Sequence, residues 1–80
     1  MIIRSQNKKE LHNLDTIKMI SVTTNSLKYF VEVNSQKVIG TYSTEEKAVK
    51  VLDMIEDAHR SMSFTDGVVF RMPADEDVEV

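Results

Sequence analysis

Apolar and polar side chains alternate most regularly in residues 27–33, near the middle of the chain. The apolar side of this alternation consists of Leu27, Tyr29, Val31 and Val33. A period of two residues is typical of a β-strand with one buried face. Residues 16–24 and 37–42 are rich in β-branched side chains and lie on either side, across short polar turns. The pattern predicts an antiparallel meander of three strands.

Two further short strands are expected, one near the start of the chain and one after the helix described next. They lie at residues 2–5 and 68–72. Between the first of them and the meander, Leu11 and Leu14 have the spacing of one helical turn or a tight loop, which would tuck both side chains under the sheet. Gly40, in the last strand of the meander, indicates a bulge or a close approach of another element.

Residues 44–62 carry apolar side chains at steps of three and four, the spacing of a helix that buries one face. These positions are Ala48, Val51, Leu52, Ile55, Ala58, His59 and Met62. Ser43 is placed as the N-cap, and Glu46 completes a capping box. Asp66 and Gly67 then form a turn. The expected fold is a single α+β domain of order β-β-β-β-α-β, an antiparallel meander sheet with one amphipathic helix packed on one face.

One helix covers only one face of a sheet, and the second face is expected to be apolar as well. Phe30 is expected there, together with Ile39 and Val69. The strand at residues 16–24 is apolar on both sides, with Ile17 and Met19 pointing one way and Ile20 and Val22 the other. An exposed apolar patch of that size usually marks an interface. We therefore expect a homo-oligomer. The alternative is that loops containing Leu11 and Leu14 cover this face.

The charges divide the chain into two unequal parts. Its 80 residues are enough for one domain with one small core. Residues 1–73 carry ten basic and nine acidic side chains, whereas residues 74–80 carry four acidic ones and no base. We expect a nearly neutral domain followed by a disordered, solvated acidic tail. The alternative is that the tail is an arm that binds a basic partner. A neutral domain does not favour nucleic acid as a partner.

Membrane and secretion signals are missing from the sequence. No stretch has the ~20 consecutive apolar residues of a membrane span, and the start lacks the apolar segment of a signal peptide. We expect a cytoplasmic protein with no membrane contact.

The side chains that carry most enzyme chemistry are missing or poorly placed. The chain has no cysteine, and its two histidines lie far apart. His12 falls in a polar loop, where a solvated side chain is expected, and His59 falls in the apolar stripe of the helix, where a packed one is expected. The histidines and carboxylates lack the spacing of a metal site, and two isolated glycines form no phosphate loop. We expect a non-enzymatic protein with no cofactor and no metal.

The candidate binding residues gather directly after the first strand. They are Arg4, Ser5, Gln6, Asn7 and Lys8, with Arg71 from the last strand. Guanidinium, ammonium and amide groups are donors that suit an anion or a nucleotide. The alternative for the loop residues is an ordinary polar turn. Arg71 points to the sheet face opposite its apolar neighbours, where it is either an interfacial ion-pair partner or a ligand clamp.

Three stretches of the chain resemble a family of small proteins. They are the opening Met-Ile-Ile-Arg-Ser-Gln-Asn-Lys, the stretch Gly40-Thr41-Tyr42-Ser43-Thr44-Glu45-Glu46-Lys47-Ala48 with the following Val51-Leu52-Asp53-Met54-Ile55, and the closing Val69-Phe70-Arg71-Met72-Pro73. The family consists of small uncharacterised proteins of phages, prophages and Gram-positive bacterial genomes. The resemblance covers most of the chain and departs from it mainly at residues 24–27 and 61–66. The family has no assigned catalytic motif, so no functional residue is carried over.

The resemblance implies a binding function. Small non-enzymatic phage proteins often block a host protein or sequester a host immune signal such as a cyclic nucleotide. Sequestering proteins of that kind are commonly compact oligomers with ligand pockets at subunit boundaries. The expected function is the capture of a host immune nucleotide signal in the bacterial cytoplasm, an anti-defence role. The alternative is an inhibitor or adaptor that acts on a host protein through the apolar sheet face or the acidic tail.

Overall fold

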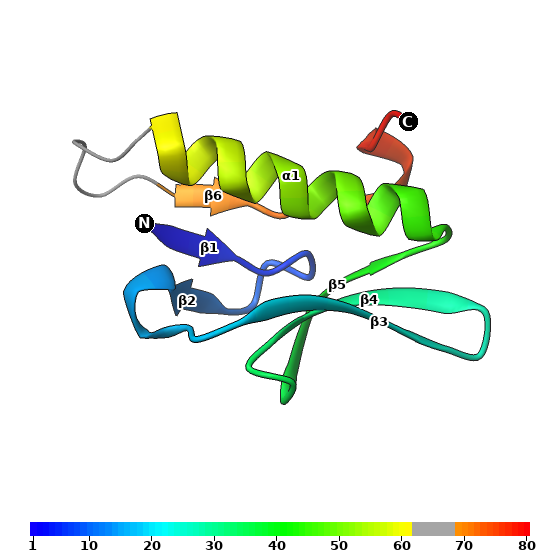
Figure 1. The fold of residues 1–80 in the computed structure, drawn as a ribbon, viewed down its shortest axis with the longest axis horizontal. Coiled ribbons are helices and arrows are strands. Elements are labelled where there is room, and N and C mark those ends of the chain that lie inside the picture. The colour runs from blue at the N-terminus through cyan, green and yellow to red at the C-terminus, as the bar shows by residue number, and fades with distance from the viewer. Residues whose placement is uncertain (62–68) are drawn as a thin grey trace.

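Two three-stranded sheets and one long helix make up the fold (Figure 1). The computed structural model describes residues 1–61 and 69–80. The predicted α+β class, with one helix packed on a sheet, is confirmed. The elements are β1 (Ile2–Arg4), β2 (Leu11–Asn13), the 3₁₀ turn η1 (Leu14–Thr16), β3 (Ile20–Asn25), β4 (Lys28–Val33), β5 (Lys37–Tyr42), α1 (Glu45–Ser61), β6 (Val69–Arg71) and the 3₁₀ turn η2 (Asp75–Asp77). The expected turn at residues 66–67 and the expected last residue of the helix, Met62, lie outside the described residues.

The predicted meander is confirmed as the sheet β3-β4-β5, in which both strand pairs are antiparallel. The turn from β3 to β4 consists of Ser26 and Leu27, both with positive φ (54° and 66°). Gly40 does mark a close approach, because a Cβ atom there would lie 2.9 Å from both Met72 Cε and Tyr42 Cε2. Overlap of that kind favours glycine over any larger residue at this position.

The second sheet has the order β2-β1-β6, and its pairing was not predicted. β1 runs antiparallel to β2 and parallel to β6, so that Ile3 is paired with His12 on one side and with Phe70 on the other. A parallel pair needs a long crossover, and here the crossover contains β2 to β5 and α1. Leu11 therefore lies on a strand and is 63% exposed, which corrects the expectation that it is tucked under the sheet.

α1 covers the sheet β3-β4-β5 and closes the core. The buried hydrophobic residues come from both sheets, the helix and the C-terminal segment. They are Ile3, Val31, Val33, Ile39, Tyr42, Ala48, Val51, Ile55, Met72 and Val78. Leu14 packs against this cluster, as expected. Among the described residues, no helix has both the length and the apolar character that crossing a membrane requires.

The expected second apolar face is not formed on the meander. Ile20 and Val22 are register partners of Val33 and Val31, so they point to the buried side. Ile39 is only 2% exposed. Opposite the core, the partners of Phe30 are the polar Thr23 and Thr41. The homo-oligomer remains a prediction, but the exposed apolar face from which we expected it is not present on the meander. Its test is the molecular mass of the protein in solution.

The start of α1 is stabilised differently from the expected capping box. Thr44, directly before the helix, accepts a hydrogen bond on Oγ1 from the Lys47 amide at 3.2 Å. The Ser43 amide donates to Asp75 Oδ1 at 2.8 Å, and not to Glu46. Asp75 also lies 3.5 Å from Lys47 Nζ. A carboxylate from the C-terminal segment therefore satisfies the backbone donor that the sequence assigned to Glu46.

Residues 74–80 are not a solvated tail, which corrects the expectation from their charge. Val78 is 4% exposed and belongs to the core. Together with the contacts of Asp75, this burial holds the segment beside the first turns of α1 (Figure 1). Three acidic side chains of the segment remain exposed, those of Glu76, Asp77 and Glu79.

We expect Asp75→Asn to lower the melting temperature at pH 7. The backbone hydrogen bond from Ser43 is the main reason why the pKa of Asp75 lies below its ordinary value of 3.8. A carboxyl whose pKa is lowered by folding stabilises the protein above its unfolded-state pKa, and this stabilisation is lost as the pH falls through the folded-state pKa. The difference between wild type and variant should therefore narrow below about pH 3.8.

Thermal unfolding of both proteins between pH 2 and pH 8 measures this difference. Asp77→Asn removes the same charge from an exposed neighbour in η2 and serves as the control. If the two variants have the same melting temperature at every pH, the Asp75 carboxylate does not stabilise the fold in the way proposed here.

Candidate functional site

The candidate site begins with two arginines on neighbouring strands. Arg4 of β1 and Arg71 of β6 are register partners in the parallel pair. Adjacent strands lie about 4.8 Å apart, and directly paired residues point to the same side of a sheet. Both side chains therefore project from the face of the sheet that is opposite to the buried side chain of Ile3. This is the face on which the sequence placed Arg71.

A third cation, Lys8, reaches the same place from the loop between β1 and β2. Arg4, Ser5, Lys8, Arg71 and Met72 line a cavity of about 200 Å³. The Lys8 carbonyl accepts hydrogen bonds from Nε and Nη2 of Arg4, at 3.2 and 2.9 Å. These bonds orient the guanidinium and leave three of its five N–H groups for another acceptor.

The loop that presents Lys8 is closed by its own hydrogen bonds. Ser5 Oγ donates to Asn7 Oδ1 at 2.7 Å and accepts from the Glu10 amide at 3.1 Å. Asn7 Oδ1 also accepts from the Lys9 amide at 2.9 Å. Lys8 itself has a φ of 68°, a left-handed conformation that glycine adopts more readily. Ser5 and Asn7 therefore shape the loop, as in the alternative of a polar turn.

Gln6 lies in the same stretch, and its side chain connects distant parts of the fold. Its Nε2 donates to the carbonyls of Thr41 and Pro73, both at 3.1 Å. The side-chain Oε1 accepts from the Thr41 backbone amide at 2.9 Å. The backbone amide of Gln6 donates to the Ile39 carbonyl at 2.8 Å. The end of β5 and the segment after β6 therefore occupy both the oxygen and the NH₂ group of the Gln6 side chain.

The cations of the cavity have no acidic partner among the described residues. The ion pairs among the described residues join Glu10 to Lys37, Lys47 to Asp75, and Arg60 to Glu56, and Glu10 also contacts the His12 ring. Like charges directly opposite each other on neighbouring strands are destabilising. A bound anion would offset the repulsion between Arg4 and Arg71.

The acid nearest to the loop is engaged elsewhere. Glu10 Oε2 lies 2.7 Å from Lys37 Nζ, and its Oε1 lies 3.1 Å from His12 Nε2. The hydrogen bond from Lys37, followed by that from His12, lowers the pKa of Glu10. His12 is thus half-buried and paired, which corrects the expectation of a solvated side chain.

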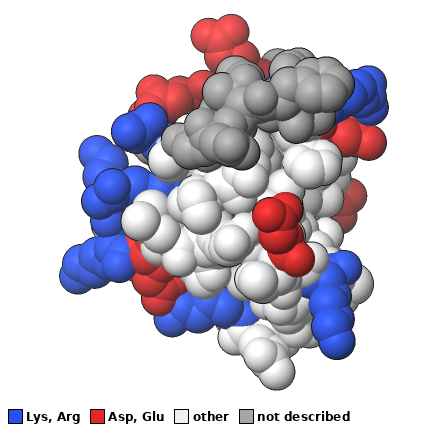
Figure 2. Space-filling view, turned by 90° about the vertical axis from the view of Figure 1, so that its left-hand side faces the viewer, with Lys and Arg blue, Asp and Glu red and all other residues white. Residues whose placement is uncertain are grey.

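The distribution of charge on the surface is uneven. Figure 2 shows the end of the molecule at which β1 begins and α1 ends. Several Lys and Arg side chains lie along the left-hand margin of this face, with acidic side chains among them, whereas mostly uncharged side chains occupy its middle. A domain with a net charge of −3 therefore still presents several basic side chains along one margin of this face.

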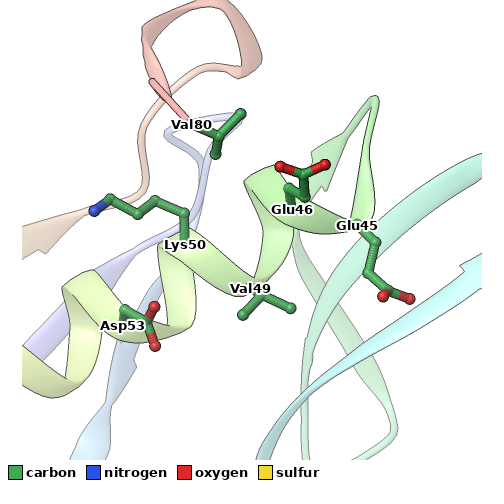
Figure 3. Close-up of a pocket in the computed structure, with 6 residues that line it drawn as sticks. All are labelled: Glu45, Glu46, Val49, Lys50, Asp53 and Val80. Atoms are coloured by element: carbon green, nitrogen blue, oxygen red, sulfur yellow. The ribbon is translucent and has the colours of Figure 1, made fainter.

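Two of the larger hollows, each of about 380 Å³, lie on α1 and offer no comparable set of groups. Figure 3 shows one of them, in which the charged ends of Glu45, Glu46 and Lys50 point in different directions. The other is a groove beside Leu52, with His59 on its rim. His59 is exposed, so the expectation of a packed histidine in the core or at its rim is wrong.

The described residues contain no group of three or more metal-binding side chains close enough to share an ion. No family model, curated protein or solved structure matches the chain.

Of the six candidate residues, the structure brings Arg4, Ser5, Lys8 and Arg71 to one cavity and uses Gln6 and Asn7 in the fold. Met72 lines the cavity and was not among the candidates. Leu11, the register partner of Arg4 on β2, was not among them either. The only sequence signal for Leu11 is its distance from the first strand, which is short enough for a hairpin.

Proposed function

We propose that this protein binds a small phosphate-bearing molecule, without chemical conversion, in the cavity between Arg4, Lys8 and Arg71. The observation that carries this proposal is the in-register pair of arginines, which has no carboxylate partner among the described residues. Guanidinium groups bind phosphate oxygens with two parallel hydrogen bonds, and a lysine adds a point charge. The cavity therefore offers donors on several sides to one anion.

A binding role is favoured over catalysis by the state of the one hydroxyl in the cavity. Ser5 is 3% exposed, and its Oγ both donates to Asn7 and accepts from the Glu10 amide. A nucleophilic serine needs a base that accepts its proton, and here the acceptor is an amide oxygen. The resemblance to small phage proteins suggests that the ligand is a nucleotide signal of a host cell, whose capture would be an anti-defence function.

Thermal unfolding and titration calorimetry with pyrophosphate, nucleoside diphosphates and cyclic dinucleotides test this proposal. A ligand at about 100 times its dissociation constant stabilises the folded state by about 2.7 kcal/mol. For a domain of this size, we expect the melting temperature to rise by about 10 °C or more. Binding should weaken as the salt concentration rises, because the attraction is between exposed charges. If no anion changes the melting temperature, the proposal is wrong, and a host protein becomes the better candidate partner.

Lys8→Gly separates binding from folding. Glycine stabilises the folded state at this position, because it adopts the left-handed conformation of Lys8 more readily. Its greater freedom in the unfolded chain destabilises the folded state. We expect a melting temperature close to that of the wild type and an affinity for pyrophosphate about tenfold lower, since one cation is lost. Lys9→Gly, at the neighbouring exposed position, is the control. Equal affinities for wild type and Lys8→Gly would remove Lys8 from the site.

A further inference from the structure

We propose that the ligand is a nucleotide whose nucleoside part lies on the outer face of the sheet β2-β1-β6, against Ile2, Leu11 and Val69. This inference rests on the proposed phosphate site and extends it along the same face. It assigns a binding surface to apolar side chains that the core does not use.

Strand register defines this outer face as two rows of three residues. Leu11, Arg4 and Arg71 are paired across the three strands and form the first row. Asn13, Ile2 and Val69 are paired in the same way and form the second row. Directly paired residues share a face, so both rows point away from the buried Ile3. Arg4 and Arg71, two of the three cations of the proposed phosphate site, thus lie in the first row. The second row beside it is largely apolar.

The apolar side chains of this face are accessible to a ligand. Leu11 is 63% exposed although it lies in the sheet, and Ile2 and Val69 are half-buried. α1 packs against the other sheet, and the core cluster takes Ile3 and Met72 from the inner side. Leu11 therefore makes an apolar surface directly beside Arg4.

The size of this surface fits one nucleotide. Three strands span about 10 Å, and two rows are about 7 Å apart along a strand. A stable protein interface needs about 800 Å² on each partner, far more than six side chains offer here. A nucleoside phosphate suits this face, because it carries phosphate at one end and, at the other, an uncharged base whose flat face can pack on Leu11, Ile2 and Val69.

Asn13 adds a polar group at the edge of the apolar row. Its Oδ1 accepts the Asp15 amide at 2.9 Å, which fixes the orientation of the side-chain amide. Its NH₂ makes no hydrogen bond within the described residues, so two donors remain for a base edge. A fixed amide beside an apolar surface is the kind of group that orients a small ligand.

Calorimetry with ADP, GDP and pyrophosphate tests the inference, because the three probes share the diphosphate. We expect at least one of the two nucleotides to bind the wild-type protein more tightly than pyrophosphate does. Leu11→Ala should weaken that nucleotide about fivefold and leave pyrophosphate unchanged. Leu27→Ala makes the same change at a 93% exposed leucine in the turn between β3 and β4 and should alter the binding of neither probe. Val69→Thr, which keeps the side-chain shape, should reproduce the effect of Leu11→Ala.

The outcomes separate this inference from the proposed function. If pyrophosphate binds and both nucleotides bind no more tightly, or if Leu11→Ala behaves as Leu27→Ala does, the nucleoside surface is wrong and the phosphate site stands. If none of the three probes binds, both proposals are overturned.

Discussion

Gln6→Ala is expected to lower the free energy of unfolding by about 3 kcal/mol. The substitution removes three side-chain hydrogen bonds and leaves the amide and carbonyl of Thr41 without these partners, whereas the Pro73 carbonyl keeps its bond from the Tyr42 hydroxyl. Each backbone group that loses its partner in a partly buried place destabilises the protein by about 1 kcal/mol or more. Because a domain of 80 residues is stabilised by only about 4 to 12 kcal/mol in total, this is a large share.

Thermal unfolding and urea titration measure this effect. For a domain of this size, about 3 kcal/mol corresponds to a fall of about 12 to 24 °C in the melting temperature. Gln36→Ala is the matched control, because Gln36 is exposed in the turn between β4 and β5. We expect it to change the stability by less than about 0.5 kcal/mol. Equal melting temperatures for the two variants would show that Gln6 does not connect the sheets.

Arg71→Gln is expected to weaken pyrophosphate binding about 10- to 100-fold, the largest effect of a single substitution on binding. A charge-assisted hydrogen bond contributes about 1.5 to 3 kcal/mol, and each 1.4 kcal/mol is a factor of ten in affinity. Arg71 is the cleaner of the two arginines to test, because Arg4 also closes the loop through the Lys8 carbonyl. Arg71 is exposed and makes no ion pair within the described residues.

The stability of the same variant provides the second measurement. Removing one of two in-register cations relieves their repulsion, so the melting temperature without ligand should stay the same or rise. Arg60→Gln is the control: it removes the same charge from an exposed position on α1, where Arg60 pairs only with Glu56 at 3.6 Å. If Arg71→Gln binds pyrophosphate as tightly as Arg60→Gln does, Arg71 is not part of the site.

The elements with strong local patterns were predictable from sequence. The alternation in residues 27–33 and the three- and four-residue steps before Ser61 correspond to β4 and α1 with small shifts at their ends. Both patterns depend on neighbours within one strand or a few helical turns, which a sequence displays directly. β2 has only three residues, and it is a strand because it pairs with β1. No local pattern is long enough to show such a strand.

The helix cap and the C-terminal segment show how a distant residue overrides a local rule. Ser43 and Glu46 have the spacing of a capping box, yet the Ser43 amide bonds to Asp75, 32 positions along the chain. Likewise, the charge of residues 74–80 predicted a solvated tail, but Val78 enters the core and carries the segment with it. Burial of this one apolar side chain stabilises the packed segment. The acidic neighbours do not oppose it, because their side chains remain exposed to water.

The sequence by itself determined the fold class, the meander, the helix and the kinds of donor near the first strand. The tertiary structure alone decided which of these donors are free. Gln6 has suitable chemistry, but the Thr41 amide uses its side-chain oxygen, and the carbonyls of Thr41 and Pro73 occupy its amide donors. Of Asn7, the loop uses only the side-chain oxygen. Arg4 and Arg71 lie 67 positions apart, and only the parallel register of β1 and β6 makes them neighbours. A candidate site therefore arises from pairing between the ends of the domain, which depends on the whole core and not on any one segment.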